Sequence, residues 1–520
     1  MSSATLLADE TVPSLTRLED VYPANVLDFQ RKRYQTLQSR FEARFKAKPH
    51  FFARSPGRVN LIGEHVDYSG YSVLPMAIDR DVVIAVRVLE DSEKKGDSGR
   101  VEVVLANTDE QFGERTFSHD KGTAVEIDST LHDWSNYFKC GYKGVFENAK
   151  NLDSRAPLSF HALIDGSVPA GGGVSSSSAF TCASALATLE ANKGRMTKGE
   201  LTNTAIKGER YAGVQCGGMD QAISIMAPMG SPLIIHFEPK LSADRISFPV
   251  STNTSSSPVF VVTNTLVVSN KVVTAPIHYN LRVVETRLAA ALLNKHVGGA
   301  DATTDAPLLT LRDIQDRYVR DTEFTGNETA VLAKLSALTD TALKREPYTL
   351  PEVATLLNTT VDAVKQRYIG PIVIGSDEFH LHARAKHVYE ESRRVFQFRD
   401  TCAQIANTDF NPTVFLTALG DLMNASQDSC RDLYDCSCDE INDLTRIARE
   451  AGAYGSRLTG AGWGGCVVSL VAESEVESFI GKVREAYYDK RRPDLKGKDA
   501  EMEDYVFASK PGGGAAVVRL

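Results

Sequence analysis

Residues 168–186, Val-Pro-Ala-Gly-Gly-Gly-Val-Ser-Ser-Ser-Ser-Ala-Phe-Thr-Cys-Ala-Ser-Ala-Leu, join a strand-like end to a glycine-rich loop and then to an alanine-rich helix. Glycines without a Cβ let the backbone approach a ligand closely, and the unpaired N–H groups at a helix N-terminus favour an anion. The stretch therefore predicts a phosphate-binding loop, although it matches no Walker A pattern and flexible linkers share its composition. The candidate residues are Gly171, Gly172, Gly173, Ser175, Ser176, Ser177 and Ser178.

Two further segments carry polar and glycine residues at close spacing. Residues 56–68 read Pro-Gly-Arg-Val-Asn-Leu-Ile-Gly-Glu-His-Val-Asp-Tyr, and residues 456–466 read Ser-Arg-Leu-Thr-Gly-Ala-Gly-Trp-Gly-Gly-Cys. In the first segment, charged and amide side chains are set among strand-like apolar residues, and this density of polar groups suits the hydroxyls of a sugar. The second segment predicts another glycine-rich turn, which leads into a strand over 467–470.

Length and composition limit the class of protein. A chain of 520 residues is too long for one hydrophobic core, so we expect two large domains. The net charge of −9 gives no attraction to nucleic acid or to an anionic membrane surface. The N-terminus has no basic leader and no apolar run approaches the roughly 20 residues of a membrane span, so we expect a cytoplasmic protein. Eight cysteines in so long a chain indicate free thiols, and the pair Cys436 and Cys438 is only weak evidence for a metal.

Patterns along the chain mix helices and strands instead of alternating them, which favours an α+β fold over a doubly wound one. Helical spacing predicts helices at 27–45, 134–150 and 179–191. Apolar runs predict strands at 82–89, 101–106, 259–263 and 265–268.

A polar stretch at 251–257 precedes one of these strands and predicts the domain boundary. The expected division is a disordered or loosely attached lead over 1–20, an N-terminal domain over 21–255 and a C-terminal domain over 256–520. Turn-rich residues 298–306 and 321–327 are expected to form loops.

The three motifs, in this order, resemble the GHMP kinase superfamily and, within it, the galactokinase family. The Gly-Glu-His-x-Asp-Tyr element at 63–68 is specific to the galactose branch. The resemblance implies a two-domain architecture with the active site in the interdomain cleft. It also implies an enzyme that uses ATP and Mg²⁺ to phosphorylate the anomeric hydroxyl of D-galactose, giving α-D-galactose 1-phosphate.

The resemblance places the catalytic aspartate at Asp220, in Gly-Gly-Met-Asp-Gln at 217–221. Phosphoryl transfer depends mainly on positioning and on charge stabilisation, so we expect Asp220 to face the acceptor hydroxyl. Arg58 is the expected partner, because a permanent cation stabilises negative charge that develops on the sugar oxygen. The alternatives are an ordinary turn aspartate and a surface ion pair.

The resemblance also implies a set of sugar-binding residues. Carboxylates accept hydrogen bonds from hydroxyls, and imidazole both accepts and donates, so these types suit a hexose. A metal site at 64–67 and a buried core tyrosine are the alternatives for these positions. The expected set is Glu64, His65, Asp67, Gly217, Gly218 and Tyr279, together with Arg58 and Asp220.

For the nucleotide, Ser177 and Glu209 match the pair that binds Mg²⁺ in the superfamily, which is chemically apt because Mg²⁺ takes few protein oxygen ligands when ATP supplies others. An exposed helix charge is the alternative for Glu209. Asn270 and Lys271 resemble nucleotide contacts. Trp134 and Tyr137 are expected to wall the adenine pocket, with a buried aromatic pair as the alternative.

Two other functions remain open from the sequence. Ser178 stands where many galactokinases have alanine, and the four-serine form resembles N-acetylgalactosamine kinase, whereas Tyr279 stands where that relative has phenylalanine. Some yeast relatives act as galactose and ATP sensors that bind a transcriptional repressor, and the catalytically silent sensor has a shortened serine loop. Because the loop here has its full length, we expect an active kinase, with a regulatory protein partner left open.

Overall fold

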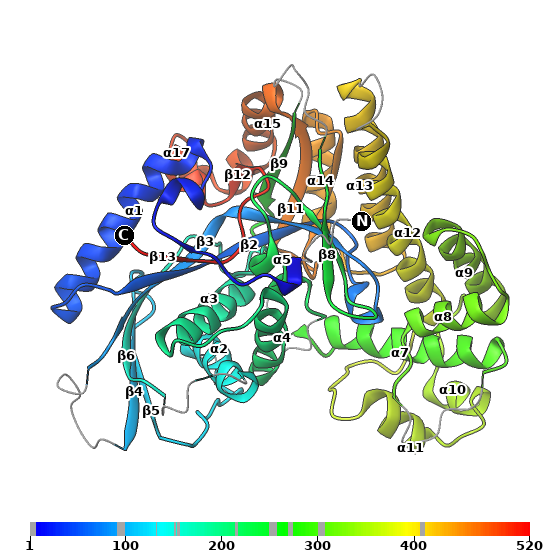
Figure 1. Ribbon diagram of the computed structural model, residues 1–520. Coiled ribbons are helices and arrows are strands. Elements are labelled where there is room, and N and C mark those ends of the chain that lie inside the picture. The colour runs from blue at the N-terminus through cyan, green and yellow to red at the C-terminus, as the bar shows by residue number, and fades with distance from the viewer. Residues whose placement is uncertain are drawn as a thin grey trace.

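The computed structural model describes residues 7–90, 99–131, 133–149, 152, 157–213, 217–248, 257–268, 274–299, 307–405 and 411–520. Two main β-sheets organise the described chain, one drawn largely from its first half and one from its second half (Figure 1). Helices pack on both sheets and form a separate helical group beside them. The expected α+β fold is therefore confirmed.

The first sheet has seven strands in the order β1-β13-β2-β3-β6-β4-β5. Its central strands are buried because both of their faces are covered. Val83 on β3 packs toward helix α1, while the next residue, Ile84, packs on the opposite side, as the two-residue period of a strand requires. The strands are β1 (Ser14–Leu15), β2 (Phe51–Ile62), β3 (Leu74–Val88), β4 (Arg100–Asn107), β5 (Arg115–Asp120), β6 (Phe160–Gly166) and β13 (Ala516–Val518).

Helix α1 (Leu27–Phe45) covers one face of this sheet, with Tyr34, Leu37 and Phe41 buried in a cluster with sheet residues. Four helices gather on the other face, and α3 and α5 pack directly against β2 (Figure 1). These helices are α2 (Ser135–Asn148), α3 (Ser176–Ala191), α4 (Lys198–Glu209) and α5 (Met219–Met226). A short hairpin of β7 (Leu233–His236) and β8 (Ser242–Arg245) follows them.

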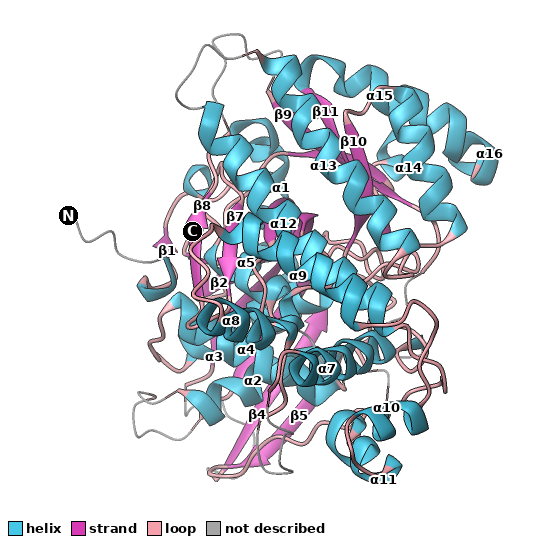
Figure 2. Cartoon of the chain, turned by 90° about the vertical axis from the view of Figure 1, so that its right-hand side faces the viewer, coloured by secondary structure: helices cyan, strands magenta, loops and turns pink. Residues whose placement is uncertain are grey.

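The second sheet is antiparallel, with the strand order β10-β11-β9-β12. Its strands are β9 (Pro258–Asn264), β10 (Gly455–Thr459), β11 (Cys466–Ala472) and β12 (Val506–Ser509). The helices that pack on it are α13 (Pro412–Asp432), α14 (Asp439–Ala451) and α15 (Val476–Val483), and Figure 2 shows them around β9, β10 and β11. Two short helices, α16 (Asp489–Arg491) and α17 (Asp499–Met502), lie between α15 and β12.

A group of helices built around α12 (Leu381–Ile405) joins the two parts, because α12 contacts α7, α9 and α13 and also reaches β2. Its members are α7 (Tyr279–His296), α8 (Leu311–Asp321), α9 (Glu328–Ala342), α10 (Leu350–Leu356) and α11 (Val361–Val364). The expected loop at 321–327 connects α8 to α9, whereas most of the expected loop at 298–306 lies outside the described residues.

The local structure differs from the sequence-based expectation in several places. Residues 7–20 are not a loose lead in the described structure: Leu7 and Ala8 are buried, and β1 pairs in parallel with β13. Residues 265–268 form no strand, because β9 ends at Asn264. Most of the proposed boundary at 251–257 lies outside the described residues, and β13 returns from the C-terminal half to the first sheet, so the division at 255 remains a prediction.

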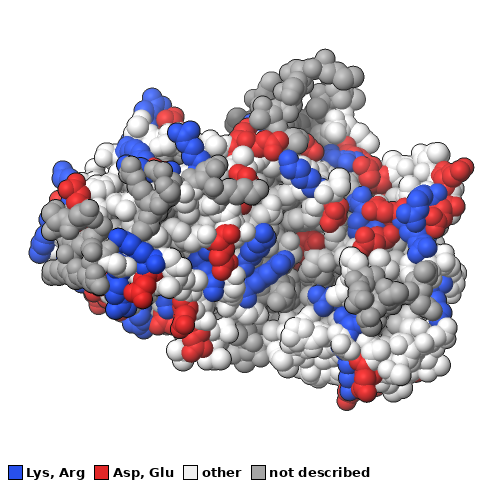
Figure 3. All heavy atoms as spheres, turned by 60° about the horizontal axis from the view of Figure 1, so that its bottom comes forward, with Lys and Arg blue, Asp and Glu red and all other residues white. Residues whose placement is uncertain are grey.

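The surface carries charges of both signs. On the face seen in Figure 3, Lys and Arg side chains lie between Asp and Glu side chains, with uncharged residues around them. Within the described part of the chain, no helix combines the length and the apolar character needed to cross a membrane.

Candidate active site

The glycine-rich loop connects the end of β6 to the start of α3, as its sequence predicted. Gly171 and Gly173 have φ values of 68° and 71°, in the left-handed region that favours glycine. Ser175 also has a positive φ, and its side chain does not cap the helix. Its hydroxyl is buried without a hydrogen-bond partner, so the first turn of α3 presents uncapped N–H groups together with a serine hydroxyl.

A cavity of about 420 Å³ opens along this loop. Trp134 and Phe180 form one wall, with their rings stacked at a centroid distance of 6.1 Å, and the Trp134 Nε1–H donates to Gly113 O at 3.0 Å. Tyr137 lies on the same wall, where burial raises the pKa of its hydroxyl to about 12. The sequence-predicted residues in this cavity are Gly171, Gly173, Ser175, Ser176, Ser177, Ser178, Trp134, Tyr137, Glu209 and Asp220.

The remaining nucleotide candidates are Gly172, Asn270 and Lys271. Gly172 lies within the same loop but is not one of the residues that line the cavity. Asn270 and Lys271 lie outside the described residues.

Glu209 ends helix α4 at the base of this cavity and is only 3% exposed, so it is not an exposed helix charge. The Ser178 hydroxyl donates to Glu209 Oε2 at 2.8 Å, and the Gln221 side-chain amide donates to the same oxygen. Ser177 shares the cavity with Glu209, but the serine hydroxyl that contacts the carboxylate is that of Ser178. Ser178 therefore fixes the orientation of Glu209, a role that its sequence position did not reveal.

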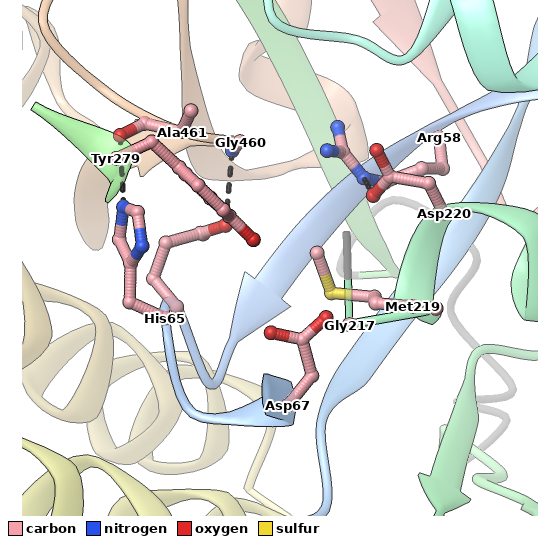
Figure 4. Close-up of a pocket in the computed structure, with 11 residues that line it drawn as sticks. Arg58, His65, Asp67, Gly217, Met219, Asp220, Tyr279, Gly460 and Ala461 are labelled. Atoms are coloured by element: carbon pink, nitrogen blue, oxygen red, sulfur yellow. Dashed lines mark hydrogen bonds and ion pairs between the residues drawn. The ribbon is translucent and has the colours of Figure 1, made fainter. Parts of the chain in front are cut away.

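A second, smaller pocket, drawn in Figure 4, shares Asp220 with the first. It gathers residues from β2 and the turn after it, from the start of α5, from the start of α7 and from the turn after β10. All eight sequence-predicted sugar residues line it, together with Met219, Gly460 and Ala461. The eight are Arg58, Glu64, His65, Asp67, Gly217, Gly218, Asp220 and Tyr279.

Asp220 lies in the first turn of α5 and lines both cavities. Its Oδ1 accepts a hydrogen bond from Arg58 Nε at 2.7 Å (Figure 4). Arg58 Nη1 donates to the carbonyl of Gly173 at 2.7 Å, so one guanidinium connects the aspartate to the glycine-rich loop. Arg58 is 1% exposed, which rules out a surface ion pair.

Asp67 faces Asp220 across the pocket, and it lies close to the backbone of Gly217. A Cβ on Gly217 would stand 2.2 Å from Asp67 Oδ2, so only glycine fits beside this carboxylate. Burial, followed by repulsion from the Asp220 carboxylate, raises the pKa of Asp67 to about 6. The pocket thus holds two carboxylates whose negative charges oppose each other, which suits hydrogen-bond donors such as hydroxyls.

Glu64 and His65 follow the end of β2 and complete the wall. Glu64 Oε1 accepts from the backbone N–H of Gly460 at 3.1 Å, and burial raises the pKa of this carboxyl to about 7. His65 Nε2 lies 2.8 Å from Ala461 O, and its ring packs against Tyr279 at a centroid distance of 5.6 Å. The described residues contain no cluster of three or more His, Cys, Asp or Glu side chains arranged to bind a metal ion.

Two residues that the sequence motifs did not identify support the part of the pocket formed by Glu64. Arg457 lies in the third motif, but no role was expected for it, because its neighbours Ser456 and Leu458 give no sign of a buried partner. It is fully buried and pairs with Glu64 at 3.0 Å between Nη2 and Oε2. Glu391 on α12 accepts from the backbone N–H groups of Gly63 and Glu64, and nothing in its local sequence indicated that contact.

Comparisons with known proteins agree with this geometry. The fold and the two cavities define a GHMP kinase: family models for the GHMP kinase N-terminal and C-terminal domains match residues 136–227 and 415–489. A third model, the galactokinase galactose-binding signature, matches residues 39–88.

Relatives that match over nearly the whole chain identify the family within the GHMP kinases. The galactokinase of Dictyostelium discoideum is 40% identical over 522 residues, which cover 98% of each chain. The galactokinase of Saccharomyces cerevisiae is also 40% identical, covering 92% of this chain and 94% of the relative. The chain belongs to the galactokinase family, and it is an ATP-dependent sugar kinase.

A solved structure supports the fold alone. The galactokinase of Lactococcus lactis complexed with galactose aligns with a TM-score of 0.63 at 23% identity, covering 93% of this chain and 99% of the other.

Proposed function

We propose that the protein transfers the γ-phosphoryl group of ATP to the anomeric hydroxyl of D-galactose, giving α-D-galactose 1-phosphate. The observation that carries this proposal is the position of Asp220, which lines both the pocket of the galactose-binding signature and the cavity of the glycine-rich loop. A side chain that borders both substrate sites is placed to orient the two reacting groups toward each other.

Asp220 and Arg58 have complementary roles in this reaction. The Asp220 carboxylate orients the acceptor hydroxyl and accepts its proton late in the transfer, while the paired Arg58 guanidinium stabilises negative charge on the sugar oxygen. Glu64, His65 and Asp67 bind other hydroxyls of the sugar, and Tyr279 closes the pocket beside His65.

Mg²⁺ is the ion that we propose to accompany ATP. The donor set fits it, because Glu209 supplies a carboxylate and Ser177 a hydroxyl in the phosphate-loop cavity, and both are the hard oxygen ligands that Mg²⁺ prefers. When bound with the nucleotide, Mg²⁺ neutralises charge on the phosphates. Ser178 and Gln221 hold the Glu209 carboxylate in place for this role.

We place the reaction in the cytoplasm. The cysteines in the described part of the chain are all free, which suits a reducing compartment.

A sugar panel tests the proposal. With saturating Mg·ATP, kcat/KM should fall in the order galactose, N-acetylgalactosamine, glucose, with galactose ahead of glucose by at least about 10³, because a misplaced hydroxyl leaves buried polar groups unpaired. If kcat/KM is highest for N-acetylgalactosamine, that sugar and not galactose is the preferred substrate. Tight galactose binding without turnover of any sugar would overturn the kinase proposal in favour of a sensor.

A further inference from the structure

Arg457 lies at the centre of a buried charged cluster behind the sugar pocket. It belongs to β10 and is completely buried. Its Nη2 lies 3.0 Å from Glu64 Oε2 and 3.9 Å from Glu391 Oε1, and its Nη1 donates to the carbonyl of Asn60 at 2.9 Å. Its Nε donates to Ser426 Oγ at 3.0 Å. The arginine from the second sheet is thus hydrogen-bonded to β2, the strand that leads into Glu64.

Glu391, on α12, holds the backbone at residues 63 and 64, where the chain leaves β2. Its Oε1 accepts from the N–H of Gly63 at 2.8 Å and from the N–H of Glu64 at 3.2 Å. Gly63 has a φ of 101°, so the chain turns sharply there, directly before the two sugar-wall residues 64 and 65. The Glu391 Oε2 accepts from Arg394 at 2.8 Å, and the nearby arginines hold the pKa of Glu391 well below its usual range.

We propose that Arg457 and Glu391 are positioning residues for the sugar: Arg457 orients the Glu64 carboxylate and favours its ionised form, and Glu391 holds the 63–64 backbone. Neither residue lines the pocket, so both act through Glu64. This inference rests on the proposed function, because it concerns the galactose side of the same site. Through Arg457 and Glu391, the C-terminal half of the chain then contributes to sugar recognition in addition to Gly460 and Ala461, which line the pocket.

The charge state of Glu64 makes Arg457 necessary. The pKa of Glu64 is raised to about 7 as the net result of opposing causes: burial and, to a smaller extent, Glu391 raise it, whereas Arg457 and Arg58 lower it. His387 on α12 faces the Glu64 carbonyl and contributes no charge at neutral pH, because burial lowers its pKa to about 4. The Cys436 thiol is also near, but burial raises its pKa well above its usual range, so it too stays neutral.

Without the Arg457 guanidinium, the pKa of Glu64 therefore rises further, to well above its wild-type value of about 7. Glu64 then holds a proton at pH 7 and turns from a pure acceptor into a donor on one oxygen. A sugar hydroxyl that donates to this carboxylate loses its partner, while the ATP cavity is unchanged.

The test measures the KM for galactose and the KM for ATP from pH 6 to pH 9 in wild type, Arg457→Lys, Arg457→Met and Glu391→Gln. We expect the Arg457 variants to raise the galactose KM at least about tenfold at pH 7, with a partial return toward pH 9 and an ATP KM within about twofold of wild type. Arg457→Lys keeps a cation and should show the smaller effect. Glu391→Gln should raise the galactose KM without adding this pH dependence.

Two controls separate positioning from general destabilisation. Arg54→Lys changes an equally buried arginine, paired with Asp81 away from both cavities, and should lower the unfolding temperature without altering the galactose KM or its pH profile. In a Glu64→Gln background, which cannot titrate, Arg457→Lys should add no pH-dependent loss.

The outcomes are distinct. Wild-type protein that fails to phosphorylate galactose would contradict the proposed function. Normal wild-type turnover with an unchanged galactose KM in both Arg457 variants, or with equal losses for galactose and ATP, would overturn the positioning role alone. If Arg457→Met does not fold, Arg457→Lys and the Glu64→Gln background decide the question.

Discussion

At the residue scale, the sugar pocket keeps two carboxylates close together at a cost to stability. The folded-state pKa of Asp67, about 6, lies above its ordinary value of 3.8, because burial and Asp220 disfavour the charged form. A carboxyl with a raised folded-state pKa destabilises the fold increasingly as the pH rises from about 4 through 6. Above that range the full cost is present, so at neutral pH the folded protein holds a charge that it would be more stable without.

Asp67→Asn should therefore raise the free energy of unfolding at pH 8 by about 1–2 kcal/mol, a figure that allows for solvent screening of this partly exposed side chain. The gain should shrink as the pH falls below 6 and vanish at about pH 4, below which the carboxyl is protonated in both the folded and the unfolded protein. Galactose KM should rise, because an amide replaces a hydroxyl acceptor. Denaturant unfolding of both proteins at the two pH values measures the difference, and a variant that is less stable than wild type at pH 8 would refute the explanation.

The residues that line the sugar pocket could be predicted from the sequence, whereas the residues behind them could not. All eight sugar-pocket residues proposed from motifs line one pocket, because each motif places its polar side chains on a short segment whose backbone is locally determined. Arg457 and Glu391 could not be assigned in the same way. Their role depends on contacts with Glu64 across hundreds of residues of chain, and such contacts leave no local pattern.

At the element scale, the ends of three helices meet at the phosphate loop. α3 begins beside the glycines, α4 ends at Glu209, and the first turn of α5 carries Asp220 and Gln221. Because Gln221 donates to Glu209 while Asp220 lines the second pocket, α5 connects the carboxylate that we propose as a Mg²⁺ ligand to the proposed sugar site.

Ser177→Ala and Glu209→Ala should each raise the Mg²⁺ concentration needed for half-maximal rate, because each removes an oxygen ligand from an ion with few protein contacts. The structure adds Ser178→Ala, which should give a smaller rise in the same direction by freeing the Glu209 carboxylate. Ser184→Ala is the matched control, since its hydroxyl donates to Phe180 O within the same helix. Identical Mg²⁺ dependence in all four variants and wild type would contradict the proposal that Ser177 and Glu209 bind Mg²⁺.

Helices were easier to predict than sheet order. The spacing over 27–45 predicted a helix with the bounds that α1 has, because amphipathic periodicity is a local property. The strands at 82–89 and 101–106 were also expected, yet β6 lies between β3 and β4 in the sheet. Strand order depends on packing between distant segments, so the sequence could not determine it.

At the scale of the whole molecule, the last residues tie the two sheets together. After β12 in the second sheet, the chain crosses to the first, where Gly512 N–H donates to Ala77 O at 2.8 Å and Gly514 N–H donates to Ala227 O at 2.7 Å. Ala227 directly follows α5, so this crossing packs against the helix of Asp220. Strands as short as β1 and β13 carry no sequence signal, which explains why residues 7–20 were expected to be loose.

We propose that Asp220, which lines both cavities, serves the transfer itself and not the binding of either substrate. Asp220→Asn keeps the shape of the side chain and removes its charge. The decisive measurement is kcat with Mg·ATP and galactose, made alongside calorimetric binding of each substrate to the same variant. We expect a kcat lower by about 10² or more with both substrates still bound, the usual loss for a positioned acid-base group. An unchanged kcat would contradict it.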